Sequence, residues 1–138
     1  MIGWIKRRWA SRGTLPAAVR AELDKEGVEL LEEQMEGRVT YRGYIVAGQR
    51  PTTGDQSTVA ALALTPRRLA VRGTQGVHLD APPGLVTSAV PEDGVLVLTY
   101  DAEDIYTTRS GAVEIRLQTP RAAEIHARLQ AWTQTSAS

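Results

Sequence analysis

The stretch SGAVEIRLQTPRAAEIHARLQAW, residues 110–132, decides how the rest of the chain is interpreted. Its first half alternates apolar and polar side chains, the period of a strand buried on one face. The apolar members of this strand are Val113, Ile115 and Leu117. Thr119 and Pro120 then suit the cap and the first turn of a helix. That helix carries one narrow apolar stripe, formed by Ala122, Ile125, Leu129 and Trp132. We expect the helix to lie over a sheet or over the mouth of a barrel.

The composition predicts one globular domain. The chain has 138 residues, 42% hydrophobic and 23% charged, and it contains no cysteine and no Phe. The absence of cysteine excludes disulfides, thiolate metal sites and a cysteine nucleophile, and it fits a reducing, cytoplasmic setting. No apolar run reaches the roughly 20 residues that span a bilayer. The basic residues are nearly all Arg, which fits a GC-rich bacterial gene.

The first 13 residues form a basic, tryptophan-bearing arm. Residues 1–12 hold Lys6, Arg7, Arg8 and Arg12 without an acid, so the arm is strongly positive although the whole chain has a net charge of +0. Apolar and basic side chains at helical spacing are typical of a helix on a membrane surface, with weak, salt-sensitive binding. The residues predicted to make this contact are Trp4, Ile5, Lys6, Arg7, Arg8 and Trp9. Alternatively, the arm folds back on the body, pairs with a second copy, frays, or binds nucleic acid or another partner.

The remaining chain is predicted to be mainly β. A helix is expected over residues 14–27, and residues 28–35 fit either an opening strand or a continuation of that helix. Further strands are expected at residues 38–47, 58–65, 68–72, 85–90, 95–100 and 113–117, with residues 48–57 a flexible loop and residues 73–84 irregular. In the strand at 38–47, alternation places one set of side chains on one face (Val39, Tyr41, Ile45 and Ala47) and the other set on the opposite face (Arg38, Thr40, Arg42 and Tyr44). This gives about seven strands followed by one helix, and a disordered tail at residues 134–138.

This order resembles the pleckstrin-homology (PH) superfold, in which seven antiparallel strands precede a C-terminal amphipathic helix. The segments that carry the resemblance are ALTPRRLAVR (63–72) and VEIRLQTPRAAEIHARLQAW (113–132), and VTYRGY (39–44) and RSGAVEIRL (109–117) resemble segments of an uncharacterised actinobacterial family. The resemblance implies an α+β fold over residues 28–133, a PH-like barrel or sandwich with a C-terminal capping helix and an extra N-terminal helix. It implies no specific activity, because the superfold includes lipid, phosphopeptide and protein binders.

Phosphoinositide-binding PH domains carry a basic cluster around the loop between strands one and two. We expect the corresponding place here to hold Glu32, Glu33, Glu36 and Gly37, with Arg38 and Arg42 nearby. An acidic rim repels a multiply charged headgroup, so tight phosphoinositide binding is not expected.

The densest basic group of the folded body consists of Arg67, Arg68 and Arg72. Alternation places Arg68 and Arg72 on one outward face with Arg67 in the adjoining turn. Guanidinium groups in this arrangement bind carboxylates or phosphates, and the simpler interpretation is a solvated face balanced by nearby acids. The loop acids Asp101, Glu103 and Asp104 lack the glycine and the distal Glu of a calcium loop, so we expect no metal there.

No grouping of residues in the sequence indicates catalysis. His78 and His126 lie in unrelated segments, no serine occupies a nucleophile motif, and no glycine-rich loop opens a helix. We therefore predict a cytoplasmic, non-catalytic PH-like module without a cofactor, an adaptor that binds a protein or an anionic membrane surface. No nucleic-acid partner is expected for the body, and self-association remains open. The alternative is a barrel that carries a small apolar ligand or lipid, which requires a cavity of at least about 300 Å³.

Overall fold

The computed structural model describes residues 13–46, 48, 52–74 and 76–137. The predicted arm, residues 1–13, lies outside this part of the chain except for Gly13. The described elements are α2 (Ala17–Glu26), β1 (Leu30–Val46), β2 (Thr52–Leu64), β3 (Leu69–Gly73), β4 (Gly76–Ala81), β5 (Thr87–Glu92), β6 (Val95–Asp101), β7 (Arg109–Gln118) and α3 (Ala122–Ala137). Short 3₁₀ turns at Pro83–Leu85 (η1) and Ala102–Asp104 (η2) complete the described fold.

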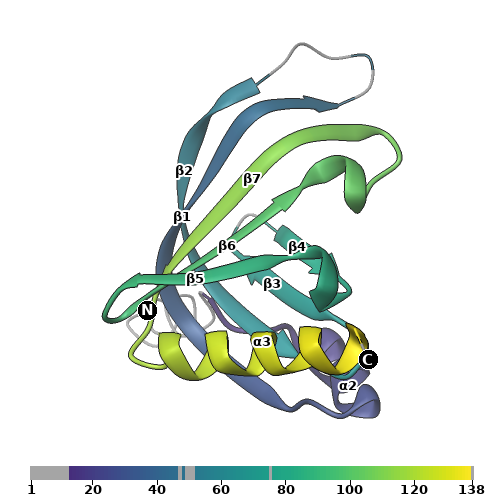
Figure 1. Cartoon of the computed structure of the whole chain (residues 1–138), viewed down its shortest axis with the longest axis vertical. Helices are drawn as coiled ribbons and strands as arrows, with labels where there is room; N and C mark the ends of the chain where they lie inside the picture. Colours follow the sequence, from purple (N-terminus) through teal and green to yellow (C-terminus); the bar gives the residue numbers. More distant parts are fainter. Residues whose placement is uncertain (1–12, 47, 49–51, 75, 138) are drawn as a thin grey trace, which may run out of the picture.

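All seven described strands belong to one antiparallel sheet, in the order β4-β3-β2-β1-β7-β6-β5. The sheet curls into a half-barrel, with α3 across one end and the β1–β2 hairpin and the start of β7 extending away at the other end (Figure 1). We call the end away from α3 the open end. The mainly β architecture with a C-terminal helix is therefore confirmed.

The inner face of the sheet and the apolar stripe of α3 form the main core. Ala122, Ile125 and Leu129 of α3 are buried in one cluster with side chains from all strands except β5. The predicted inward residues of β7 are fully or almost fully buried: Val113, Ile115 and Leu117. Thr119 caps α3 as expected, because its Oγ1 accepts a hydrogen bond from the Arg121 N–H at 3.1 Å.

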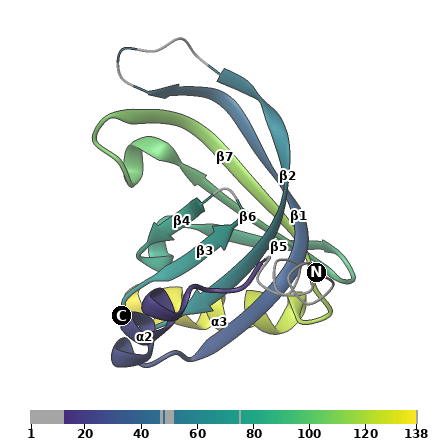
Figure 2. The ribbon, with the colours of Figure 1, turned by 180° about the vertical axis from the view of Figure 1, so that it is seen from behind.

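The predicted N-terminal helix is also present, and it packs on the outer face of the sheet (Figure 2). Leu15 and Leu23 are buried against Ala61 and Ala63 of β2, a separate small core. Small alanines on the outer face of β2 leave room for this helix. Gly27 ends the helix with φ +90°, a conformation that glycine adopts without strain.

The strand count is confirmed, but the strands are divided differently from the prediction. One long strand, β1, joins residues 30–35 of the ambiguous segment to residues 38–46 of the expected strand, and a bulge near Gln34 (φ 59°) interrupts it. The supposedly irregular segment 73–84 contains β4, which the prediction missed. Strand β2 begins at Thr52, so the expected loop at 48–57 is shorter. Helix α3 continues to Ala137, past the boundary expected before the tail at 134–138.

Candidate functional site

All four tyrosines of the chain gather at the open end of the half-barrel. Tyr41 and Tyr44 of β1 lie with ring centroids 5.1 Å apart, tilted by 56°. Burial raises the pKa of Tyr41, and the neighbouring Tyr44 and Tyr106 raise it further. Burial likewise raises the pKa of Tyr100, again with contributions from the other three rings. Tyr41 and Tyr44 thus form a ring pair, and Tyr100 and Tyr106 lie close enough to influence these pKa values; we call these four residues the aromatic cluster.

Arg109, the first residue of β7, lies within this aromatic cluster. Its guanidinium carbon is 4.5 Å from the centroid of the Tyr106 ring, within the range of a cation–π contact. Its Nη1 donates a hydrogen bond of 3.2 Å to the Tyr44 hydroxyl. Gln56 of β2 donates a weaker bond of 3.4 Å to the Tyr41 hydroxyl. We call Tyr41, Tyr44, Tyr106 and Arg109 the tyrosine–arginine site.

A bulge in β1 brings the two β1 tyrosines to the same face. The register of β1 shifts between Tyr41 and Tyr44 against β2 and between Arg42 and Ile45 against β7, and Gly43 has φ +59°. The predicted alternation was therefore wrong beyond Gly43: Tyr44 packs against the core beside Tyr41, and Ile45 is 38% exposed. Ala47, predicted on the face of Ile45, lies outside the described residues. A glycine inside a strand pattern, as in YRGY, is the sequence signal that indicates such a bulge.

A glycine of β7 makes room for this bulge. Gly111 has φ +108°, and a Cβ placed there would lie 2.5 Å from the Gly43 carbonyl oxygen and 2.7 Å from Cα of Tyr44. Real Cβ atoms do not approach backbone so closely, so only glycine fits without a shift. The two strands are shaped locally to hold Tyr44 next to Arg109.

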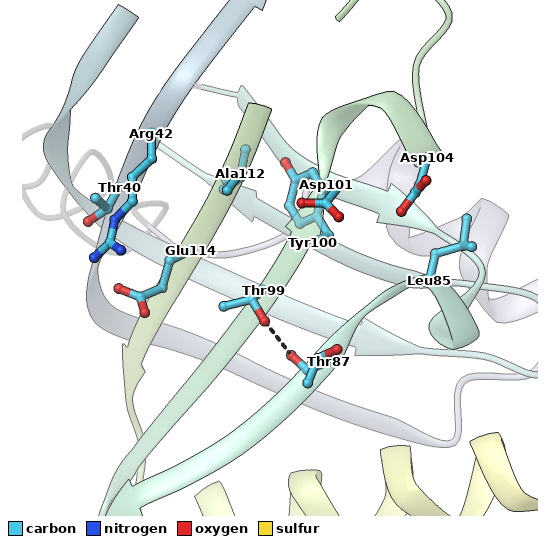
Figure 3. A pocket seen from close by; sticks show the side chains of 11 residues that line it. Thr40, Arg42, Leu85, Thr87, Thr99, Tyr100, Asp101, Asp104, Ala112 and Glu114 are labelled. Atoms are coloured by element: carbon cyan, nitrogen blue, oxygen red, sulfur yellow. Dashed lines mark hydrogen bonds between the residues drawn. The ribbon is translucent and has the colours of Figure 1, made fainter. Parts of the chain in front are cut away.

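A second candidate is a hollow of about 260 Å³ on the outer face of the sheet (Figure 3). Arg42 and Glu114 line one side, and Asp101 and Asp104 with Leu85 lie at the other (Figure 3). The remaining lining residues are Thr40, Thr87, Thr99, Tyr100, Ala112 and Val113. The hollow is shallow, polar and more acidic than basic. The loop acids Asp101 and Asp104 thus face a surface hollow, and the described residues include no group of three that could hold a metal ion.

A larger hollow of about 430 Å³ lies farther along the outer face. It is bordered by two arginines that already have carboxylate partners, since Arg38 pairs with Asp55 at 2.9 Å and Arg116 with Glu92 at 3.4 Å. Val59 also lines it and contacts the backbone position of Gly13, where the described chain begins. The arm residues Trp4, Ile5, Lys6, Arg7, Arg8 and Trp9 lie outside the described residues.

The structure separates the members of the predicted basic patch. Arg68 is engaged by carboxylates on three sides, with Glu26 at 2.8 Å, Asp80 at 3.0 Å and Glu22 at 3.7 Å. It joins α2 to β4, and its charge is more than compensated. Arg67 and Arg72 form no ion pair with the described residues, so the patch is reduced to these two side chains.

The acids assigned to the loop between the first two strands lie instead within β1, which corrects the predicted position of that loop. Two of them fasten the helices: Glu32 accepts a hydrogen bond of 3.0 Å from the Thr119 hydroxyl, and Glu33 accepts one of 3.0 Å from the Leu15 N–H. Gly37 packs against the carbonyl oxygen of Arg116 on β7. The acids therefore give no information about the turn between β1 and β2.

Both histidines are part of the packing. His78 is buried, its Nε2 is 2.9 Å from the Thr58 hydroxyl, and burial lowers its pKa. Nδ1 of His126 on α3 lies 2.8 Å from the hydroxyl of Ser88 on β5. This second pair has the distance of a nucleophile and its base, but Ser88 is buried and lines neither hollow. The pair fixes α3 to the edge strand β5.

Among the described residues, no helix is both long and apolar enough to cross a membrane. A scan against protein-family models gives no match, and a search of the curated proteins finds none with a matching sequence. The structure defines the class of fold, an antiparallel β half-barrel with a C-terminal helix. A proposal for the function therefore has to rest on the geometry of the candidate site.

Proposed function

We propose that this protein is a non-catalytic binding module with PH-like architecture, an adaptor that docks a partner protein at the open end of its half-barrel. The single observation that carries the proposal is the tyrosine–arginine site. Tyrosine and arginine are enriched at the energetic centres of protein interfaces, because each offers a large apolar surface together with a polar group. Here four such side chains converge at one end of the domain.

The distribution of packing supports a binding role at this end. Helix α3 covers the opposite end, and buried side chains such as Leu62, Leu98 and Ile115 fill the space beneath the sheet. Tyr41, Tyr44 and Tyr106 are only partly buried, and Arg109 is exposed. A partner can therefore reach the rings and the guanidinium without opening the core. The same filled interior disfavours the alternative of a carrier for a small apolar ligand or lipid.

A membrane-peripheral role through residues 1–12 belongs to the same proposal. The support is the sequence pattern of the arm together with its point of attachment, because Gly13 is packed between Val59 and Gln34 on the outer face of the sheet.

Two experiments test the adaptor. A photoreactive phenylalanine analogue at position 106 should cross-link a protein partner in the native cell, and the cross-link should disappear with R109Q and persist with R42Q on the outer face. A cross-link that forms equally well in R109Q would contradict docking at the open end.

Co-sedimentation with anionic and neutral vesicles, for the full chain and for one starting at Thr14, tests the membrane role of the arm. We expect anionic, salt-sensitive binding that requires the arm, and no binding by either chain would refute the membrane role.

A further inference from the structure

We infer that the tyrosine–arginine site binds a single carboxylate attached to an apolar group, with the carboxylate on Arg109 and the apolar group on the tyrosine rings. The inference rests on the proposed binding function and names the chemistry of its ligand. Two sources share this chemistry: an acidic residue beside an apolar residue in a peptide, or a small carboxylic acid.

Arg109 is oriented by aromatic groups and is not neutralised by the described part of the chain. The other oriented arginines of the described chain pair with carboxylates at 4.0 Å or less, and these are Arg20, Arg38, Arg68, Arg116 and Arg121. Arg109 forms no such pair there and instead contacts the Tyr106 face and the Tyr44 hydroxyl. Its orientation is thus fixed in advance while its charge and its other N–H donors remain available, the state of a guanidinium that is ready for an anion.

The surroundings of Arg109 favour one negative charge over two. A phosphate group is commonly held by several cations, whereas Arg109 is the only basic residue in the β6–β7 connection and the first half of β7. A carboxylate also matches the planar fork of the guanidinium.

The groups around the guanidinium are apolar and ring-shaped. Tyr41 and Tyr44 are partly buried and packed on the core, as is Ile105 of the β6–β7 connection. A ligand that consists only of a carboxylate would leave the tyrosine rings exposed to water. An attached aromatic or branched aliphatic group would cover the rings and remove further apolar surface from water, which strengthens binding. The bulge at Gly43 and the matching glycine at position 111 hold Tyr44 in this position.

The inference is tested by NMR titration of the full chain, following backbone amides, with four probes. Phenylacetate and the capped peptide acetyl-Leu-Asp-Phe-amide carry the proposed chemistry from the two sources. Phenylacetamide lacks the charge, and phenyl phosphate carries a second one. Each titration is repeated with R109Q and with R42Q, a matched arginine on the outer face that has no ion pair with the described residues.

We expect the carboxylate probes to shift the amides of Tyr44, Tyr106 and Arg109, with weak binding that R109Q reduces by about tenfold or more and that R42Q leaves unchanged. The stronger of the two probes identifies the source. The inference would be overturned if phenylacetamide bound as well as phenylacetate, or if phenyl phosphate bound more tightly. It would also be overturned if R109Q left the binding unchanged, or if no probe shifted any amide. If the probes fail while the cross-link at position 106 still depends on Arg109, the ligand chemistry is wrong and the adaptor stands; if both fail, the proposed function fails as well.

Discussion

Tyr100 of β6 donates a hydrogen bond of 2.8 Å to the backbone carbonyl oxygen of His78 on β4. The two strands are far apart in the order of the sheet, since β4 forms one edge and β6 lies next to the other edge. The bond therefore spans the concave side of the half-barrel. It also satisfies a buried carbonyl that has no further strand beside it.

Removal of this bond should destabilise the domain. In Y100F the ring still fills its place, but the His78 carbonyl loses its donor, which costs about 1–3 kcal/mol of unfolding free energy. Urea denaturation measures the change. Y106F is the control, because Tyr106 is only partly buried and its hydroxyl makes no hydrogen bond with the described residues. We expect a change below about 0.5 kcal/mol there. Equal losses in the two variants would contradict the assigned role of Tyr100.

The same tyrosine predicts a loss of stability in alkali. Burial raises the pKa of Tyr100 above the value of 10.0 that applies in the unfolded chain. The folded state therefore binds this proton more tightly, and its stabilising effect is complete below about pH 10 and declines above it, by at most about 1.4 kcal/mol per pH unit. Denaturation midpoints between about pH 9 and pH 11 should fall more steeply for the wild type than for Y100F. Parallel curves would refute this assignment.

His78 predicts a second loss of stability, on the acid side. Burial lowers its pKa below the unfolded value of 6.5, so the neutral form is favoured in the fold. Its contribution is present above about pH 6.5 and is lost as the pH falls through the lower, folded pKa. We expect urea midpoints to drop between about pH 7.5 and pH 5.5 in the wild type and in H126Q, and to change less in H78Q. A drop of the same size in H78Q would show that another group titrates.

The glycine pair that shapes the tyrosine–arginine site gives a graded prediction. G111A places a methyl group against the Gly43 carbonyl and Tyr44, in addition to an unfavourable φ, and should cost about 1–3 kcal/mol while changing the near-ultraviolet circular dichroism of the tyrosines. G43A has open space around its Cβ, so only the backbone penalty of about 1–2 kcal/mol applies. A smaller effect of G111A than of G43A would contradict the close approach of the two strands.

We expect Arg68 to stabilise the fold and to have no role in binding. Its side chain is 23% exposed and serves three carboxylates, so R68Q leaves Glu26 without its closest partner, and we expect a loss of about 1–2 kcal/mol in thermal or urea denaturation. R67Q, at an exposed neighbouring position, should change stability by less than about 0.5 kcal/mol. If both variants leave the denaturation midpoint unchanged, the network contributes nothing measurable.

The sequence predicted best where one regular period governs a segment. The alternation in β7, the stripe of α3 and the helix ended by Gly27 were confirmed because each rests on local spacing and a standard cap. Strand β4 was missed because its sequence, Gly76–Ala81, is short and flanked by turn residues. The seven predicted strands thus included one false division and one omission, which cancelled in the count.

The tyrosine–arginine site was beyond local reasoning. Its members come from positions 41, 44, 106 and 109, and only the pairing of β1 with β7 brings the first two near the last. The bulge at Gly43 then reverses the face assigned to Tyr44. For the basic group, acids that balance the charge were expected, but not which ones, since the carboxylates around Arg68 come from α2 and β4, distant in sequence.

The central position of β1 also has a consequence for biosynthesis. One side of β1 pairs with β2, which the ribosome delivers directly afterwards, but the other side pairs with β7, from Gly37↔Leu117 to Val46↔Arg109. A nascent chain therefore keeps an open edge on β1 until β7 has been synthesised. Sheets with pairings between strands distant in sequence fold slowly, and their unpaired strand edges are prone to aggregation until the pairing is complete. We expect the half-barrel to close only after β7 has left the ribosome.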